Sequence, residues 1–314
     1  MKLSVVSTMY LSAKFLPEFC RRSIDAASRF SADHELILVN DGSPDNSLDV
    51  ALAQQAIYPA IKIVDLSRNF GHHAAIVAGV EHAVGELVFL IDCDLEEQPE
   101  WLERFHNELT SKDIDVVFGS QEKRVSSGAN NVLGSLFWKL LNVSASVQIP
   151  HNPMTCRLMT RRYVDALLRV EDRVLYLAGV FAWAGFQQAP LALVKTPRTG
   201  AHKSTYSLSR KLLQTADSFA SFSSAPLTMI FLLGLAIWIG SMAAGTYLGI
   251  EKLIRPTAVL SGFTSMMLSI WFLSGTIIMT LGILGIYISK IFQEVKRRPQ
   301  FIVRKVFYGR NAYH

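Results

Sequence analysis

Short apolar runs alternate with helical patterns along the first 120 residues. Strands are expected at residues 3–8, 35–40, 61–66, 86–91 and 115–119, and helices near 15–30, from about 44, at 74–83 and at 99–109. Uninterrupted apolar strands that alternate with helices are typical of a parallel sheet covered on both faces. We therefore predict a Rossmann-like α/β fold with a mostly parallel sheet.

The C-terminal part of the chain has a different pattern, with two long apolar runs. No Asp, Glu, Lys or Arg occurs from Phe219 to Ile250 or from Pro256 to Ser289. Each run exceeds the ~20 apolar residues that cross a bilayer. We predict two transmembrane helices, at about 227–250 and 257–289, within an anchor of residues 225–289. The preceding residues contain no comparable run, which excludes a transporter with many helices.

A shorter amphipathic pattern precedes the first apolar run. Residues 208–222 place apolar side chains at three- and four-residue spacing, opposite Arg210, Lys211 and Asp217. Such a pattern is typical of a helix in the plane of the membrane interface. The predicted organisation is a catalytic domain at 1–205, an interfacial amphipathic helix at 206–224, the two spans, and a basic cytoplasmic tail at 290–314.

The net charge of +5 belongs to the membrane end of the chain. From Lys290 onward there are seven basic residues and one acidic residue, Glu294, whereas the turn between the two apolar runs is nearly neutral. Basic residues beside a span mark the cytoplasmic side, and they favour anionic lipid headgroups over nucleic acid as the partner. We predict a protein of the cell inner membrane with both termini and the catalytic domain in the cytoplasm.

Composition and cysteine usage agree with a reduced cytosolic domain attached to a membrane. Half of the residues are hydrophobic and only 18% are charged, against roughly 25% in soluble globular chains. Cys20, Cys93 and Cys156 are odd in number and lack C-x-x-C spacing, which argues against a disulfide framework or a zinc site. The adjacent His72 and His73 have no third ligand at a suitable spacing, which also argues against zinc.

The strongest chemical signal is the pair Asp92 and Asp94 after the strand at 86–91. Two carboxylates one residue apart suit a hard cation such as Mg²⁺ or Mn²⁺ that also binds a diphosphate. Glu96 and Glu97 follow directly, and so much negative charge favours a bound cation over a solvated acidic turn. The position also fits, because ligands of open α/β sheets bind outside the carboxyl ends of the strands.

Asp41 and Gly42 close the second predicted strand. The carboxylate of Asp41 can accept hydrogen bonds from a uracil or thymine imide or from ribose hydroxyls. An ordinary turn followed by a helix cap at Ser43 or Asp45 is an equally good interpretation. Neither G-x-x-x-x-G-K-[ST] nor G-x-G-x-x-G occurs, so the phosphate cradles of kinases, ATPases and nicotinamide enzymes are missing.

These segments together resemble a known family. The resemblance is carried by the two predicted spans and by the segments LSVVSTMY, ELILVNDGSPDNS, VDLSRNFGHHAAIVAGVEHAVGELVFLIDCDLEEQPE, CRLMTRRYVDAL, HKSTYSLSRKL and FQEVKRRP. Together they resemble the inverting family 2 glycosyltransferases that act on polyprenyl phosphates, such as bactoprenol glucosyltransferases and dolichyl-phosphate mannose synthase. The resemblance implies a GT-A fold. It also implies transfer of one sugar from a UDP- or dTDP-type donor to undecaprenyl or another polyprenyl phosphate, for cell-envelope glycans such as lipopolysaccharide.

The resemblance also assigns roles to individual positions. It implies nucleotide-sugar binding by Thr8, Tyr10, Asp41, Ser67, Asn69 and Asp92, metal binding by Asp92 and Asp94, catalysis by Asp94, Arg124, Arg157 and Lys203, and acceptor-phosphate binding by Arg124, Arg157, Lys203 and Ser204.

Some positions depart from the family pattern. Gln121 replaces an expected Arg, and Thr155 stands where relatives often have an Asp suggested as catalytic. A phosphomonoester with a second pKa of about 6 is already mostly dianionic at neutral pH, so a phosphate acceptor can do without a carboxylate base. The alternatives are a catalytically silent membrane scaffold or binding subunit, and a transferase whose acceptor is a lipid-linked sugar hydroxyl. Small residues in the spans are compatible with a homo-oligomer and equally with packing inside one hairpin.

Overall fold

The structure, a computed structural model, describes residues 1–121, 153–170, 177–195, 254 and 263–309. Those up to residue 195 and from 297 onward belong to one compact unit, and α10 (Phe263–Lys296) belongs to a second. The first unit carries the predicted chemistry.

The elements of the first unit alternate between strands and helices along the chain. In order they are β1 (Leu3–Met9), α1 (Leu16–Phe30), β2 (His34–Asn40), α2 (Ser47–Ile57), β3 (Ile61–Leu66), α3 (His72–Glu81), β4 (Leu87–Leu90), a 3₁₀ turn η1 (Pro99–Trp101), α4 (Leu102–Lys112), β5 (Val116–Gln121), β6 (Pro153–Thr160), α6 (Arg161–Leu168), α7 (Leu177–Trp183), β7 (Gln188–Leu193) and β8 (Val303–Phe307).

The described strands form one eight-stranded sheet in the order β7-β5-β6-β4-β1-β2-β3-β8. Pairing is parallel for β4-β1-β2-β3 and for β5-β7. Strand β6 is antiparallel to both β4 and β5, and β8 is antiparallel to β3. The predicted α/β fold with a mostly parallel sheet is therefore confirmed, and the antiparallel strands are features that the apolar pattern did not indicate.

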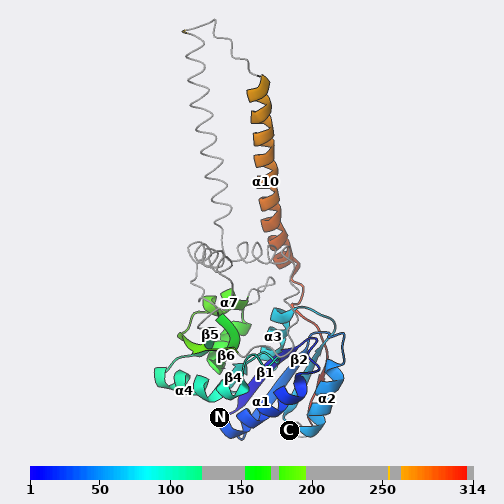
Figure 1. The fold of residues 1–314 in the computed structure, drawn as a ribbon, viewed down its shortest axis with the longest axis vertical. Coiled ribbons are helices and arrows are strands. Elements are labelled where there is room, and N and C mark those ends of the chain that lie inside the picture. The colour runs from blue at the N-terminus through cyan, green and yellow to red at the C-terminus, as the bar shows by residue number, and fades with distance from the viewer. Residues whose placement is uncertain (122–152, 171–176, 196–253, 255–262, 310–314) are drawn as a thin grey trace. The chain divides into compact units, whose positions relative to one another are not determined.

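Helices cover both faces of the sheet (Figure 1). Helices α1, α2 and α4 pack together on one face, and α3 and α6 pack on the other. All seven residues of β1 are buried, as expected for a strand between two helical layers. Successive side chains of β1 point to opposite faces of the sheet. Val5 belongs to the hydrophobic cluster that contains Phe19 and Phe105, whereas Val6 faces α3. A Cβ at Gly79 of α3 would lie 2.5 Å from Cγ1 of Val6, so this helix approaches the sheet as closely as a glycine allows.

Local side-chain chemistry decides where α2 begins. The pattern predicted a helix from about Pro44, but α2 starts at Ser47. Oδ1 of Asp45 accepts hydrogen bonds from the backbone N–H of Ser47 at 3.1 Å and from its hydroxyl at 2.6 Å. Such local bonds compete with helical pairing and delay the first turn.

The predicted membrane elements are described only in part. The interfacial helix at 206–224 and the first span at 227–250 lie outside the described residues, and α10 overlaps the range predicted for the second span. No helix within the described residues is both long enough and apolar enough to cross a bilayer. The two-helix anchor stays a prediction.

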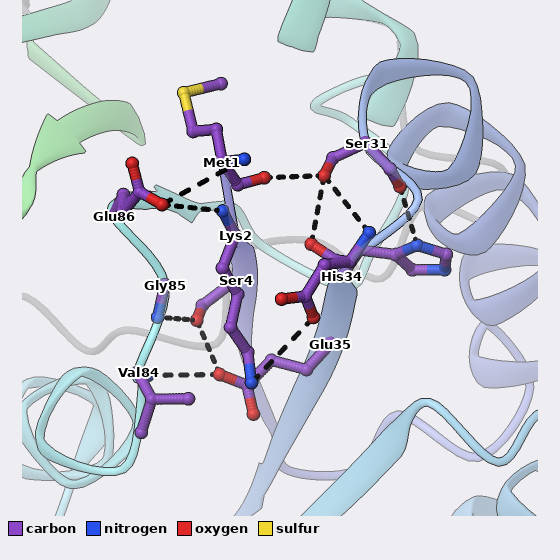
Figure 2. Close-up of polar contacts among 10 residues, drawn as sticks. Met1, Lys2, Ser4, Ser31, His34, Glu35, Val84, Gly85 and Glu86 are labelled. Atoms are coloured by element: carbon purple, nitrogen blue, oxygen red, sulfur yellow. Dashed lines mark hydrogen bonds and ion pairs between the residues drawn. The ribbon is translucent and has the colours of Figure 1, made fainter.

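A polar network closes the amino ends of the central strands (Figure 2). The buried hydroxyl of Ser4 on β1 donates to Oε1 of Glu35 on β2 at 2.6 Å and accepts from the N–H of Gly85 at 2.8 Å. The N–H of Val84 donates to the same Glu35 oxygen at 3.0 Å. The Ser4 side chain thus connects β1 to β2 and to the turn before β4, at the edge of the sheet opposite the predicted site.

We expect Ser4→Ala to destabilise the domain without touching the predicted site. The substitution leaves the buried N–H of Gly85 without its acceptor, which typically costs about 1–3 kcal/mol of unfolding free energy. Chemical denaturation of the purified protein measures this loss. Ser28→Ala is the matched control, because the Ser28 hydroxyl donates to the carbonyl of Asp25 on an exposed helix face. Equal stability of the two variants would contradict the prediction.

Candidate functional site

The predicted donor-binding residues gather at one edge of the sheet, which we call the carboxyl edge. It is formed by the C-terminal ends of the parallel strands β1, β2, β3 and β4. Thr8 lies at the end of β1, Asp41 follows β2, Ser67 and Asn69 follow β3, and Asp92 and Asp94 follow β4. Tyr10 is 46% exposed just beyond β1. The fold thus places these predicted positions on one side of the sheet, although their individual roles stay predictions.

His72 connects two of these residues. Its Nδ1 lies 3.1 Å from Oγ1 of Thr8, and its Nε2 lies 3.7 Å from Oδ1 of Asp92. The imidazole sits in the first turn of α3, directly after Gly71, whose φ of 98° turns the chain into the helix. In the sequence, His72 is a candidate only for a zinc site, and no local signal places it at the carboxyl edge. The described residues hold no group of three or more His, Cys, Asp or Glu side chains arranged for a metal ion.

Asp41 organises the loop that follows β3. Its carboxylate is buried and accepts hydrogen bonds from the backbone N–H of Phe70 at 2.7 Å and of Gly71 at 3.0 Å. Burial raises the pKa of this carboxyl, and the two backbone donors oppose the rise. A carboxylate oxygen has two lone pairs, so Asp41 can accept a further donor from a ligand. The structure adds a loop-positioning role to the base-binding role that the resemblance implies.

Gly42 allows the loops after β2 and β3 to touch. Its φ is +58°, and a Cβ there would lie 2.5 Å from backbone atoms of Arg68 and Asn69. Only glycine avoids both the strained backbone and this clash. The two loops are therefore fixed relative to each other by backbone contact as well as by Asp41.

The acidic segment after β4 surrounds a buried carboxyl. Glu97 is fully buried, its Oε2 accepts from the N–H of Asp92 at 3.3 Å, and its Oε1 lies 3.4 Å from Nζ of Lys195. Burial, and after it the charge of Asp92, raises the pKa of Glu97 to about 7, while Lys195 opposes the rise. Lys195 also lies 3.7 Å from Oε2 of Glu96. Neither Glu97 nor Lys195 was predicted as a site residue, since Lys195 is 98 positions away from Glu97 in the sequence and matches no motif.

The donor atoms after β4 fit a hard divalent cation. Asp92 is 24% exposed at its side chain, and Oδ1 of Asp94 accepts from the N–H of Glu96 at 3.1 Å. Leu95, between Asp94 and Glu96, has a φ of 63°, which bends the chain sharply at this point. Mg²⁺ commonly takes one or two protein carboxylates and completes its shell with water and substrate phosphate. Asp92 and Asp94 therefore suit Mg²⁺ or Mn²⁺ as ligands.

Arg157 occupies an interior position on β6. It is 4% exposed, and its guanidinium lies 3.4 Å from the ring centroid of Phe181 on α7. It donates to the carbonyl oxygens of Met154 and Thr155, each at 3.3 Å. Burial lowers the pKa of Arg157 to about 10. The other predicted acceptor-phosphate residues, Arg124, Lys203 and Ser204, lie outside the described residues, so the grouping of this set stays a prediction.

Comparisons with known proteins give the family. Residues 4–168 match Glycosyl transferase family 2. A Mycobacterium tuberculosis protein described as a glycosyltransferase is 40% identical over 307 residues, covering 98% of this chain and 89% of the relative. The SfII prophage-derived bactoprenol glucosyl transferase of Shigella flexneri is 29% identical over 310 residues, covering 98% of this chain and 99% of that protein.

One solved structure among the matches is glucosyl-3-phosphoglycerate synthase from Mycobacterium tuberculosis in complex with Mn²⁺, UDP-glucose and phosphoglyceric acid. It is 19% identical, covers 70% of this chain and 77% of that one, and has a TM-score of 0.45.

The family match over more than half of the chain and the relative at 40% identity lead to the same conclusion: this protein is a glycosyltransferase of family 2.

Proposed function

We propose that this enzyme transfers a single sugar, with inversion, from a UDP- or dTDP-type nucleotide sugar to undecaprenyl phosphate or another polyprenyl phosphate. The observation that carries the proposal is the alignment, over 98% of the chain, with a protein named for bactoprenol glucosylation. The arrangement of Thr8, Asp41 and Asp92 along the carboxyl edge supports it, because a nucleotide diphosphate needs base, ribose and phosphate contacts side by side. The product would be a lipid-linked sugar for cell-envelope glycans.

The acceptor chemistry makes few demands on this chain. A phosphate dianion is already a nucleophile near neutral pH, so no side chain has to remove a proton from it. This agrees with Thr155 on β6, which offers no carboxylate. The remaining task is to bring two anionic substrates together, and in this proposal it is performed by Arg124, Arg157, Lys203 and Ser204.

Asp92 and Asp94 would hold Mg²⁺ or Mn²⁺ against the donor diphosphate. A bound divalent cation supplies stabilisation of the negative charge that develops on the departing nucleoside diphosphate. His72 would help to keep Asp92 in place through its contact at 3.7 Å.

The proposal also places the enzyme at a membrane. The charge-free runs at 219–250 and 256–289 and the basic residues around them support a two-span anchor with the catalytic domain and both termini in the cytoplasm. The nucleotide sugar and the phosphate end of the lipid would then be available on the same side.

The proposed reaction is tested with the full-length protein, undecaprenyl phosphate and a panel of nucleotide sugars, with lipid products read by mass spectrometry. We expect one donor to give a lipid phosphate that carries a single sugar. Asp94→Asn should abolish this product, because it removes a metal-binding charge, whereas Asp49→Asn on the exposed side of α2 should not. Near-normal turnover by Asp94→Asn, together with insensitivity to EDTA, would exclude the metal role.

Thr155 provides a test of the acceptor. Thr155→Ala should cost far less than the 10²–10⁴-fold typical of losing a general base. The rate should rise with pH through the second ionisation of the phosphate, at about 6, and then level off. The rise should persist in Glu97→Gln, which removes a buried carboxyl whose pKa is about 7. A severe loss in Thr155→Ala with transfer to a sugar hydroxyl would instead support the hydroxyl-acceptor alternative.

The predicted topology is tested by labelling cysteines in intact cells. A membrane-impermeant thiol reagent should modify Lys252→Cys in the external turn and spare Ser204→Cys in the cytoplasm. The native cysteines at 20, 93 and 156 are all buried, so their background labelling should be low. The opposite labelling pattern would place the catalytic domain outside and remove it from the supply of nucleotide sugars.

A further inference from the structure

Strand β8 reaches the carboxyl edge from the far end of the sequence. It pairs with β3 in an antiparallel register, with Lys305 opposite Asp65 and Val303 opposite Leu66. Arg304 lies between these two pairs, where the register shifts, and has no partner in the ladder. Bulges of this kind bend a strand and re-aim a side chain, often next to an active site.

Arg304 contacts the loop that follows β3. Its Nη2 donates to the carbonyl oxygen of Ser67 at 2.6 Å, and the N–H of Ser67 donates to the carbonyl oxygen of Ile302 at 2.9 Å. Both backbone groups of Ser67 are therefore held by the C-terminal segment. Ser67 begins the loop whose N–H groups, at Phe70 and Gly71, are bound by Asp41.

A second set of contacts leads from Arg304 to the loop after β2. Its Nη1 lies 3.5 Å from Oδ2 of Asp65, whose Oδ1 accepts from the side-chain amide of Asn40 at 2.8 Å. Oδ1 of Asn40 in turn accepts from the N–H of Ser43 at 3.1 Å. Arg304, Asp65 and Asn40 thus connect the ends of β8, β3 and β2.

The burial of Arg304 and Asp65 indicates what the loss of their contact would change. The Arg304 side chain is 59% exposed, so the ion pair by itself adds little stability in water. The Asp65 side chain is only 4% exposed, but its Oδ1 keeps the hydrogen bond from Asn40 when Arg304 is removed. The loss should therefore appear as a disturbance of the two loops that Asp65 and Ser67 hold, more than as a loss of global stability.

We propose that Arg304 is a positioning residue of the donor site. It holds the loops at 40–43 and 67–71 in the geometry in which Asp41 and its neighbours meet the nucleotide. The inference rests on the proposed function for the nature of the ligand, but the contacts from Arg304 to both loops are independent of it. It also means that the segment following the predicted second span contributes to the catalytic domain.

The test compares Arg304→Gln with Lys305→Gln in the full-length protein. The control removes the same charge from the next residue, whose ammonium lies over the Phe307 ring, 4.7 Å from its centroid. UDP and dTDP serve as probes, and their Kd values are measured by titration. We expect Arg304→Gln to weaken binding by about threefold to tenfold and to raise the donor KM by a similar factor with little change in kcat. Arg304→Lys should recover part of the affinity, and Lys305→Gln should bind as the wild type does.

Hydrogen exchange in the nucleotide-free protein provides a readout that does not depend on activity. Peptides that cover residues 40–47 and 66–71 should exchange faster in Arg304→Gln than in Lys305→Gln, while the melting temperatures stay close. Equal exchange in the two variants would overturn the proposal, as would unchanged Kd and KM in Arg304→Gln. If the wild type bound neither nucleotide, the proposed function would fail, and the exchange data would still decide whether Arg304 positions the two loops.

Discussion

A sheet covered by helices on both faces leaves its strand ends as the places where polar groups can reach a ligand. All of β1 and the last five residues of β2 are buried, so the middle of either strand is shielded from solvent and from a ligand. The parallel pairing of β4-β1-β2-β3 brings four of these ends together at one edge. The location of the site follows from this constraint, and its chemistry follows from which side chains come directly after each strand.

The loops at that edge are held by contacts with one another as well as by side chains of the neighbouring strands. Asp41 supplies acceptors for two backbone N–H groups of the loop after β3, and Gly42 allows the same two loops to come into contact. His72 and Glu97 make comparable links to the segment after β4. Most of the polar atoms named here have a partner, which means that the edge is largely organised before any substrate arrives.

Apolar patterning was sufficient to locate the strands that lie between two helical layers. Strands β1 to β5 each follow from an uninterrupted apolar run, and the acidic pair after β4 followed from its position behind such a run. The edge strand β8 could not be found in this way, because its central residues are Arg304 and Lys305 and it is buried on neither face. Edge strands need less apolar surface and so leave a weaker signal.

The side-chain contacts within the site could not be predicted from the sequence either, because they join residues that are far apart in the chain. Asp41 binds amides 29 and 30 positions away, and Lys195 pairs with a glutamate far from it in the chain, so no local spacing connects these groups. His72 was weighed as a metal ligand because adjacent histidines suggest one, whereas its observed neighbours are a hydroxyl on β1 and a carboxylate after β4. Family resemblance named the candidate positions, and the fold supplied partners for those that the structure describes.

The order in which ribosomes make the chain gives β8 a further significance. Arg304 is synthesised 237 residues after Ser67, the residue it holds. Until then the outer edge of β3 has unpaired backbone donors and acceptors, and a bare edge can pair with another chain. Gln55 of α2 completes the closure by donating to the carbonyl oxygens of both Ile61 and Phe307. The outer edge of β3 can therefore be covered only after residues 303–307 have been synthesised.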